Sequence, residues 1–164
     1  MTTPLKVLFA VSECAPFVKT GGLADVAGAL PKALAALGVD VRVLMPAYPA
    51  LSAALASAEP VAEMEGGKVV AVAAEGLSLL LLDAPHLFDR PGGPYAGPDG
   101  RDWPDNAQRF AALSRAAARL AIDGAGGWRP DVLHVHDWQT GLALAYAKLW
   151  GGAPPGVATI HNIA

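Results

Sequence analysis

The sequence Lys19-Thr20-Gly21-Gly22 joins an apolar run to a helical pattern, and its residue types suit the binding of an anion. Unpaired backbone N–H groups at the start of a helix favour negative charge. Gly21 and Gly22 have no Cβ, so a phosphate can approach their backbone closely. Lys19 adds a positive charge, although without the two glycines it would read as an ordinary surface lysine. We therefore expect Lys19, Gly21 and Gly22 to contact phosphate.

Polar residues also follow two later apolar runs. Asp137 and Trp138 follow one of them, and His161 and Asn162 follow the other. A carboxylate accepts hydrogen bonds from hydroxyl groups and an indole stacks on a sugar ring, so this pairing suits a carbohydrate. If these strands and the first one belong to one parallel sheet, Lys19, Asp137 and His161 lie at the same edge. Open α/β sheets bind ligands at that edge.

Structural roles compete with binding at these positions. His134 and His136 share one face of their strand; we expect His134 to be a core residue with a satisfied hydrogen bond and leave His136 undecided. Asp137 could instead cap the next helix. Asp25, in the first turn of a helix, fits stabilisation of the helix dipole as well as a ligand contact. His161 has no visible helix of its own to cap, which favours a ligand role.

The elements that position these residues alternate between strands and helices, which is typical of an α/β fold with a parallel sheet. Gly22–Leu37 carries an apolar face of Leu23, Val26, Leu30 and Leu34, and Pro31 predicts a kink there or two helices end to end. We predict strands at Lys6–Val11, Val39–Met45, Asp131–His136 and Gly156–His161, and further helices at Asp105–Asp123 and Gln139–Trp150.

The middle of the chain follows a different pattern. Val61–Met64, Lys68–Ala74 and Leu77–Asp83 read as short strands joined by glycine turns, which predicts an antiparallel section. Pro85–Pro104 is rich in proline, glycine and aspartate, so we predict a loop that is functional or mobile. In the helix after it, Phe110, Leu113, Ala117 and Leu120 are expected to face the core.

Composition limits the classes of protein to consider. A length of 164 residues with 53% hydrophobic and 16% charged residues predicts one folded domain, residues 1–164, not a disordered segment. A net charge of −3 without a basic block gives no indication of nucleic-acid binding. The longest apolar run is too short for a membrane span, and no signal-peptide pattern opens the chain. With Cys14 as its one cysteine, the sequence favours a cytoplasmic protein.

Three strings together resemble the bacterial glycogen synthase and starch synthase family: KTGGLADV at residues 19–26, HVHDWQTG at residues 134–141 and TIHN at residues 159–162. The resemblance runs from about Lys6 to the last residue and extends more weakly to Tyr95 in the long loop. It implies the N-terminal, acceptor-side domain of a retaining glucosyltransferase with two Rossmann-like domains (the GT-B fold). The nucleotide-binding domain is then absent from this chain, which alone is expected to be inactive.

The resemblance also implies substrates and roles. The full enzyme would transfer glucose from ADP-glucose, or another sugar nucleotide, to an α-1,4-glucan. Lys19, Gly21 and Gly22 would bind the donor, and His161 and Asp137 would be catalytic. Acceptor contacts would come from Asp25, Tyr95, Trp138 and Asn162, with Asp137 also binding the acceptor. No metal or other cofactor is expected.

Three alternatives remain open from the sequence. Another two-domain glycosyltransferase, or a sugar-nucleotide epimerase, would share the architecture and the glycine turn. A metal hydrolase would use the histidines of residues 134–137, although the aspartate comes one residue early for that motif. A glucan-binding domain would keep the fold without the chemistry.

Overall fold

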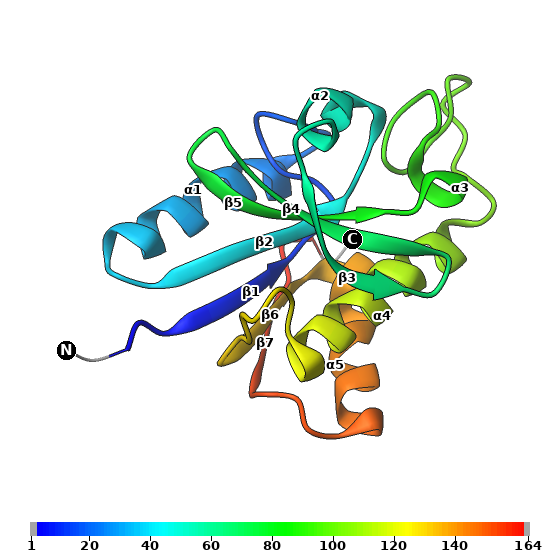
Figure 1. The fold of residues 1–164 in the computed structure, drawn as a ribbon. Coiled ribbons are helices and arrows are strands. Elements are labelled where there is room, and N and C mark those ends of the chain that lie inside the picture. Colours follow the sequence, from blue (N-terminus) through cyan, green and yellow to red (C-terminus); the bar gives the residue numbers. More distant parts are fainter. Residues whose placement is uncertain (1–2, 163–164) are drawn as a thin grey trace.

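A computed structural model describes residues 3–162, in which a seven-stranded sheet runs in the order β3-β4-β5-β2-β1-β6-β7 (Figure 1). The elements in chain order are β1 (Lys6–Ala10), α1 (Gly22–Ala36), β2 (Asp40–Pro46), the 3₁₀ turn η1 (Pro49–Leu51), α2 (Ser52–Leu55), β3 (Glu59–Met64), β4 (Gly67–Ala74), β5 (Leu77–Asp83), α3 (Pro85–Phe88), α4 (Asn106–Asp123), β6 (Val132–His136), α5 (Asp137–Trp150) and β7 (Gly156–Thr159).

The parallel part of the sheet contains the reversal in strand order that open α/β proteins use for binding. β1 pairs in parallel with β2 on one side and with β6 on the other, and β6 pairs in parallel with β7. Right-handed crossovers in opposite directions place their helices on opposite faces. Accordingly, α1 lies on one side of the sheet and α4 and α5 lie on the other (Figure 1). The carboxyl ends of β1 and β6 therefore border a natural crevice.

The strands from the middle of the chain, β3, β4 and β5, pair antiparallel with one another, as the short glycine turns between them predicted. β3 pairs with β4 and β4 pairs with β5, whereas β5 returns to the sheet in parallel with β2. Gly66 and Gly76 have φ values of 75° and 73°, which glycine adopts without a steric penalty. The hairpins extend the sheet beyond its parallel part.

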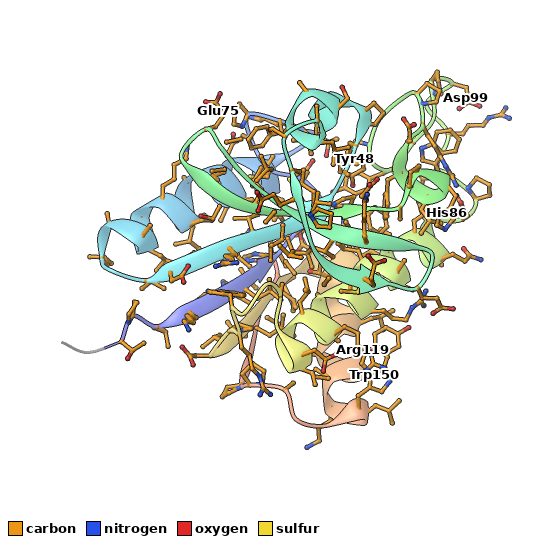
Figure 2. The ribbon with its side chains drawn as sticks, viewed as in Figure 1. Tyr48, Glu75, His86, Asp99, Arg119 and Trp150 are labelled. Atoms are coloured by element: carbon orange, nitrogen blue, oxygen red, sulfur yellow. The ribbon has the colours of Figure 1, made fainter. Side chains whose placement is uncertain are left out.

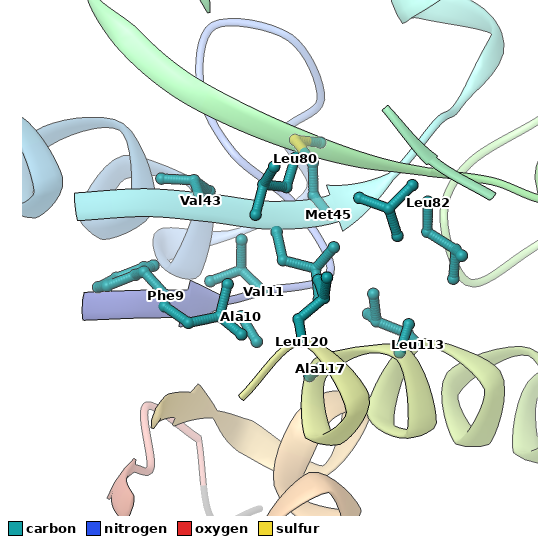
Figure 3. Packing of buried hydrophobic residues seen from close by; sticks show 14 of the residues in the cluster. Phe9, Ala10, Val11, Val43, Met45, Leu80, Leu82, Leu113, Ala117 and Leu120 are labelled. Carbon is teal, nitrogen blue, oxygen red and sulfur yellow. The ribbon is translucent and has the colours of Figure 1, made fainter. Parts of the chain in front are cut away.

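Much of the core lies between the sheet and α4. Phe110, Leu113, Ala117 and Leu120 are all buried, which confirms the apolar face expected for this helix. Figure 3 shows Leu113, Ala117 and Leu120 facing side chains of β1, β2 and β5. Each large aliphatic side chain buried here contributes about 1.5–3 kcal/mol of transfer free energy. On the outer surface, Arg119 of α4 lies over the ring of Trp150 in α5, at 4.3 Å from the ring centroid (Figure 2).

Helix α1 differs from the sequence expectation in two ways. It continues as a single helix through Pro31, so of the two expected alternatives the pair of end-to-end helices is wrong and the kink stays a prediction. Its buried residues are Leu23, Ala24, Ala27 and Pro31, whereas Val26, Leu30 and Leu34 are only half-buried. Small side chains allow the helix to pack closely: a Cβ on Gly28 would lie 2.6 Å from the carbonyl oxygen of Ala15. Leu23 nevertheless belongs to the core, and Leu30 and Leu34 pack against it, so the predicted face is confirmed in part.

Short helical segments were missed from the sequence. Residues 49–55 form η1 and α2, and α3 occupies the start of the segment predicted to be entirely loop. Each segment has four residues or fewer, too few to show a 3.6-residue period. Other boundaries moved by one or two residues; α5 begins at Asp137 and β7 ends at Thr159. Between residues 3 and 162, no helix has the length and apolarity to cross a membrane.

Candidate functional site

A pocket of about 560 Å³ lies at the carboxyl edge of the parallel strands. We call it the strand-end pocket. It is lined by segments that follow β1, β6 and β7, by the start of α1 and by the long loop. Its residues are Glu13, Thr20, Gly21, Gly22, Leu23, Val26, Tyr95, Asp137, Trp138, Gln139, His161 and Asn162. Seven of the nine residues singled out from the sequence are in this list; Lys19 and Asp25 are not.

The glycine turn forms the N-terminal end of α1, as the sequence predicted. Gly21 is the N-cap residue, and no side chain of the described residues makes a capping hydrogen bond to this end. A Cβ on Gly22 would meet no described atom within 4 Å, and one on Gly21 would come no closer than 3.8 Å to Glu13 Oε1. The fold itself therefore does not require glycine at these positions. Their small size leaves room on the pocket side, next to the helix N-terminus.

Lys19 and Asp25 form an ion pair beside the pocket. Lys19 Nζ lies 2.7 Å and 2.8 Å from the two carboxylate oxygens of Asp25, and both side chains are more than half exposed. Asp25 is in the first turn of α1, where a carboxylate also favours the helix dipole. The lysine expected to meet phosphate is thus held by a neighbouring carboxylate in this structure.

Asp137 connects the ends of β6 and β7. Its Oδ1 accepts a hydrogen bond of 2.6 Å from the backbone N–H of His161, so its side chain does not cap α5. The residue has φ of 55°, a left-handed conformation that costs a non-glycine residue about 1 kcal/mol or more. This sharp turn joins strand to helix without a loop. Such strain is maintained only where the surrounding structure fixes the backbone.

The rings of three histidines form a row that begins at the pocket with His161. His134 is half-buried, and its Nε2 lies 2.8 Å from Thr159 Oγ1, as expected for a core histidine. His136 is fully buried, and its Nδ1 lies 2.9 Å from His161 Nε2. The ring of His136 is 4.1 Å from that of His134 and 5.2 Å from that of His161. Burial is the main cause that lowers the pKa of His134, and it lowers the pKa of His136 to about 3. His136 is therefore a neutral ring.

The aromatic residues of the pocket come from two elements. Trp138, in the first turn of α5, is 59% exposed and meets Phe110 edge to face at 5.2 Å. Tyr95, in the long loop, shares a hydrogen bond of 2.8 Å with Ser12 Oγ. Burial, together with the charge of Glu13, raises the pKa of Tyr95 to about 12, so its hydroxyl stays protonated. An exposed indole and a protonated phenol are groups that contact sugars.

The loop that carries Tyr95 is tied to α4 by Arg109. This arginine is buried, and it donates hydrogen bonds to the carbonyls of Leu87 and Pro94 and to Asn106 Oδ1 at 2.7–2.8 Å. Asn106 in turn donates from Nδ2 to the carbonyl of Tyr95. Burial is the main reason that the pKa of Arg109 is lowered from its usual value. The network fixes the position of Tyr95.

Two buried polar residues of the pocket were missed from the sequence. Glu13 is buried, and its Oε2 accepts hydrogen bonds from the backbone N–H and the hydroxyl of Thr20, so it shapes the turn before α1. Gln139 is also buried, and its Oε1 has no hydrogen-bond partner among residues 3–162. Glu13 follows the first strand, so the strand-end rule applied to Asp137 could have found it. No sequence signal separates Gln139 from an ordinary helix residue.

Neither a metal centre nor a reactive thiol emerges from the described residues. No group of three His, Cys, Asp or Glu side chains in the described part of the chain is arranged to hold a metal ion. The thiol of Cys14 is buried, and this burial raises its pKa to about 11. A thiol with that pKa is a poor nucleophile near neutral pH.

Comparisons with known proteins agree with the arrangement. Residues 6–164 match the family model described as the starch synthase catalytic domain. Glycogen synthases of Roseobacter denitrificans and Cereibacter sphaeroides are each 58% identical to the chain over at least 97% of its length. The solved catalytic domain of starch synthase IV from Arabidopsis thaliana, bound to ADP and acarbose, superposes with a TM-score of 0.72 at 28% identity and covers 98% of the chain.

The chain spans about a third of the length of these proteins. It covers 35% of the Roseobacter denitrificans protein, 34% of the Cereibacter sphaeroides protein and 34% of the Arabidopsis thaliana chain. The matched third corresponds to their N-terminal part.

Proposed function

The chain belongs to the starch synthase catalytic domain family, and from this membership we propose that it is the N-terminal, acceptor-side domain of a glycogen synthase. The full-length protein would transfer glucose from ADP-glucose to the non-reducing end of an α-1,4-glucan, with retention of configuration. The observation that carries the proposal is the strand-end pocket, in which a helix N-terminus, an aspartate, a histidine and two aromatic side chains meet. A metal hydrolase and an epimerase belong to other families.

The donor diphosphate would bind at the start of α1. Gly21 and Gly22 leave space beside backbone N–H groups there, and the helix dipole favours the negative charge of a leaving diphosphate. Lys19 would exchange its contact with Asp25 for a phosphate oxygen. An exposed ion pair contributes about 0–1 kcal/mol, so a diphosphate can displace the carboxylate at little cost.

The acceptor glucan would lie against the other side of the pocket. Asp137 and Asn162 offer oxygen atoms to sugar hydroxyl groups, and Trp138 offers an exposed ring face for stacking. Tyr95 would approach from the long loop. Asp25 would join these contacts once Lys19 has turned to the diphosphate.

Catalysis would depend on His161 at the end of β7. Positive charge develops on the transferred glucose as the diphosphate leaves, and preorganised dipoles aimed at that charge lower the barrier. The carbonyl or the imidazole of His161 would supply such a dipole. Its backbone is fixed by Asp137, so little reorganisation is needed during the reaction. Lysine and backbone N–H groups would neutralise the diphosphate, so the proposal requires no metal.

The relatives support a nucleotide and a carbohydrate as ligands. ADP and acarbose are bound in the Arabidopsis thaliana structure, and ADP is what remains after glucose leaves ADP-glucose. The high identity to two bacterial glycogen synthases favours glycogen as the glucan. The proposal places the enzyme in the cytoplasm.

Steady-state kinetics of the full-length protein, with each substrate varied in turn, test the proposal. Asp137→Asn removes the charge, keeps an acceptor for the His161 N–H and tolerates positive φ; it is expected to raise mainly the KM for glycogen. His161→Ala is expected to lower kcat far more than it weakens either substrate. Circular dichroism provides the folding control. Absence of transfer from ADP-glucose to glycogen would refute the enzyme and favour a glucan-binding domain.

A further inference from the structure

His136 and Asp137, at the junction of β6 and α5, hold His161 at two points. Asp137 Oδ1 accepts its backbone N–H at 2.6 Å, and His136 Nδ1 lies 2.9 Å from its ring Nε2. Main chain and side chain are therefore fixed separately. Asp137 already has a part in the proposed chemistry, but His136 lies beneath the pocket and is not among its lining residues.

The position of His136 is itself tightly determined. Its ring is 4.1 Å from the ring of Phe9 and 4.1 Å from that of His134, and none of its surface is exposed. Its backbone N–H donates to Thr140 Oγ1 at 2.7 Å, which ties the end of β6 to the first turn of α5. A ring packed in this way holds one orientation.

One hydrogen atom must lie between the two imidazoles. Two nitrogen atoms 2.9 Å apart form a hydrogen bond only when one is protonated and the other accepts. The other ring nitrogen of His136, Nε2, is buried and has no partner within the described part of the chain. A buried N–H without an acceptor is rarer in proteins than an under-satisfied acceptor. The hydrogen of His136 therefore belongs on Nδ1.

We propose that His136 is a positioning residue that fixes the tautomer of His161, by donating its Nδ1–H to Nε2 of His161. His161 then carries its own hydrogen on Nδ1. Its imidazole offers an N–H donor at Nδ1 and has no lone pair free to act as a base. The low pKa of His136, about 3, is consistent with a neutral donor throughout the physiological range.

The catalytic consequence rests on the proposed function. In a glucosyl transfer, this tautomer leaves the backbone carbonyl of His161, and not its imidazole, to face the developing positive charge. The ring N–H would donate to a substrate oxygen, and the ring would not remove a proton from the acceptor. Loss of the bond from His136 frees the ring to rotate and to exchange tautomers. We expect this change to lower kcat, because the protein groups that bind the two substrates remain in place.

Histidine side-chain ¹⁵N NMR of the full-length protein tests the tautomers directly. We expect a protonated Nδ1 and an unprotonated Nε2 for both His136 and His161, with assignment by the single variants. A protonated Nε2 on His136 would overturn the proposal. This readout does not depend on activity, so it remains decisive even if the protein transfers no glucose.

A matched pair of variants tests the kinetic role. Asparagine places an amide N–H near the position of His136 Nδ1, and leucine has the same shape without a donor. We expect His136→Leu to lower kcat by about tenfold or more, with both KM values within about twofold, and His136→Asn to recover most of that loss. His134→Gln serves as the control, since it keeps a partner for Thr159 on the same strand face.

The outcomes separate the two proposals. Equal kcat values for His136→Asn and His136→Leu, in folded proteins with similar melting temperatures, would refute the positioning role and leave the transferase intact. Absence of transfer by the unaltered protein would refute the function but not the tautomer. If both His136 variants unfold, the NMR measurement on the unaltered protein still decides the proposal.

Discussion

Lys19 is paired with Asp25 in the structure, and the proposed donor site would give it a second partner. Asp25 holds the lysine in an exposed pair 2.7 Å long, whereas the start of α1 offers a nearby place for a more highly charged diphosphate. Exposed pairs are weak because water and salt screen them. Under the proposed function, Asp25 would be a temporary partner that keeps Lys19 near the pocket without binding it strongly.

The first prediction concerns this exchange in the full-length protein. Lys19→Ala removes a charged contact worth about 1.5–3 kcal/mol, so kcat/KM for ADP-glucose is expected to fall about tenfold to a hundredfold. Asp25→Asn leaves the lysine in place, and we expect it to retain or increase kcat/KM for the donor. Kinetics at low ADP-glucose concentration measure both. An unchanged Lys19→Ala enzyme would identify Lys19 as a surface lysine.

The second prediction concerns His136 and acid stability. An unfolded histidine has a pKa near 6.5, whereas burial lowers that of His136 to about 3. Between these values the unfolded chain binds more protons, so stability conferred by the neutral ring is present above pH 6.5 and is lost as the pH falls. We expect the ring to account for about 1–2 kcal/mol of the difference in unfolding free energy between pH 7 and pH 5.

Urea unfolding at pH 7, 6 and 5 checks this value. His136→Asn, which has no titrating ring, is expected to show a shallower pH dependence than the unaltered protein. Identical slopes for the two would mean that His136 can be protonated in the folded state, in conflict with its burial.

At the scale of elements, the sequence predicted helices that are long enough for the hydrophobic period to repeat several times. α4 has 18 residues, and its four expected core positions are buried. By contrast, η1, α2 and α3 have no more than four residues each, and their backbone depends on tertiary contacts. The buried face of α1 was predicted only in part: Leu23 is buried as expected, whereas the burial of the small residues beside it was not foreseen. The helix passes so close to Ala15 that a Cβ on Gly28 would lie 2.6 Å from its carbonyl oxygen.

The long loop shows the same limit. Its composition predicted a loop that is functional or mobile, whereas an anchor from a buried arginine of the following helix cannot be anticipated from loop residues. Arg109 holds the carbonyls of Leu87 and Pro94, and the N–H of Trp103 donates to the carbonyl of Tyr95 at 3.0 Å. The composition of a loop reflects only its own residues. The hydrogen bonds that anchor this loop join residues up to 22 positions apart, so composition does not predict them.

The third prediction concerns this anchor. Arg109→Leu leaves buried carbonyl oxygens without a donor, and we expect the free energy of unfolding to fall by about 3–5 kcal/mol. Faster hydrogen exchange at the Gly93 and Trp103 amides should accompany it, because both donate within the loop. Arg119→Leu, at an exposed position of the same helix, is the control and is expected to change stability by about 1 kcal/mol or less. Equal effects of the two would refute the anchoring role.

At the scale of the whole molecule, topology explains why residues distant in sequence meet. The ends of β1, β6 and β7 lie together because these strands are parallel neighbours, so Glu13, Asp137 and His161 share one pocket. This meeting was predictable from the strand-end rule alone. The hydrogen bonds between His136, Asp137 and His161 were not, because they depend on the register that pairs His136 with Thr159. A difference of one residue in this register would turn every side chain to the other face.

The fourth prediction concerns the chain as a catalyst. Trp138 is 59% exposed and His161 is also exposed, so water has access to the groups proposed to act on the transferred glucose. Electrostatic stabilisation of a transition state is strongest where water is excluded and the dipoles are fixed. The relatives that this chain matches are about three times as long, which provides polypeptide that could close the pocket.

We therefore expect the purified 164-residue chain to fold, by circular dichroism, and to transfer no measurable glucose from ADP-glucose to glycogen. The full-length protein, assayed at the same concentration, is the matched control. Turnover by the 164-residue chain at a rate near that of the control would show that one domain suffices, and it would contradict the assignment of this chain as the N-terminal domain of a two-domain enzyme.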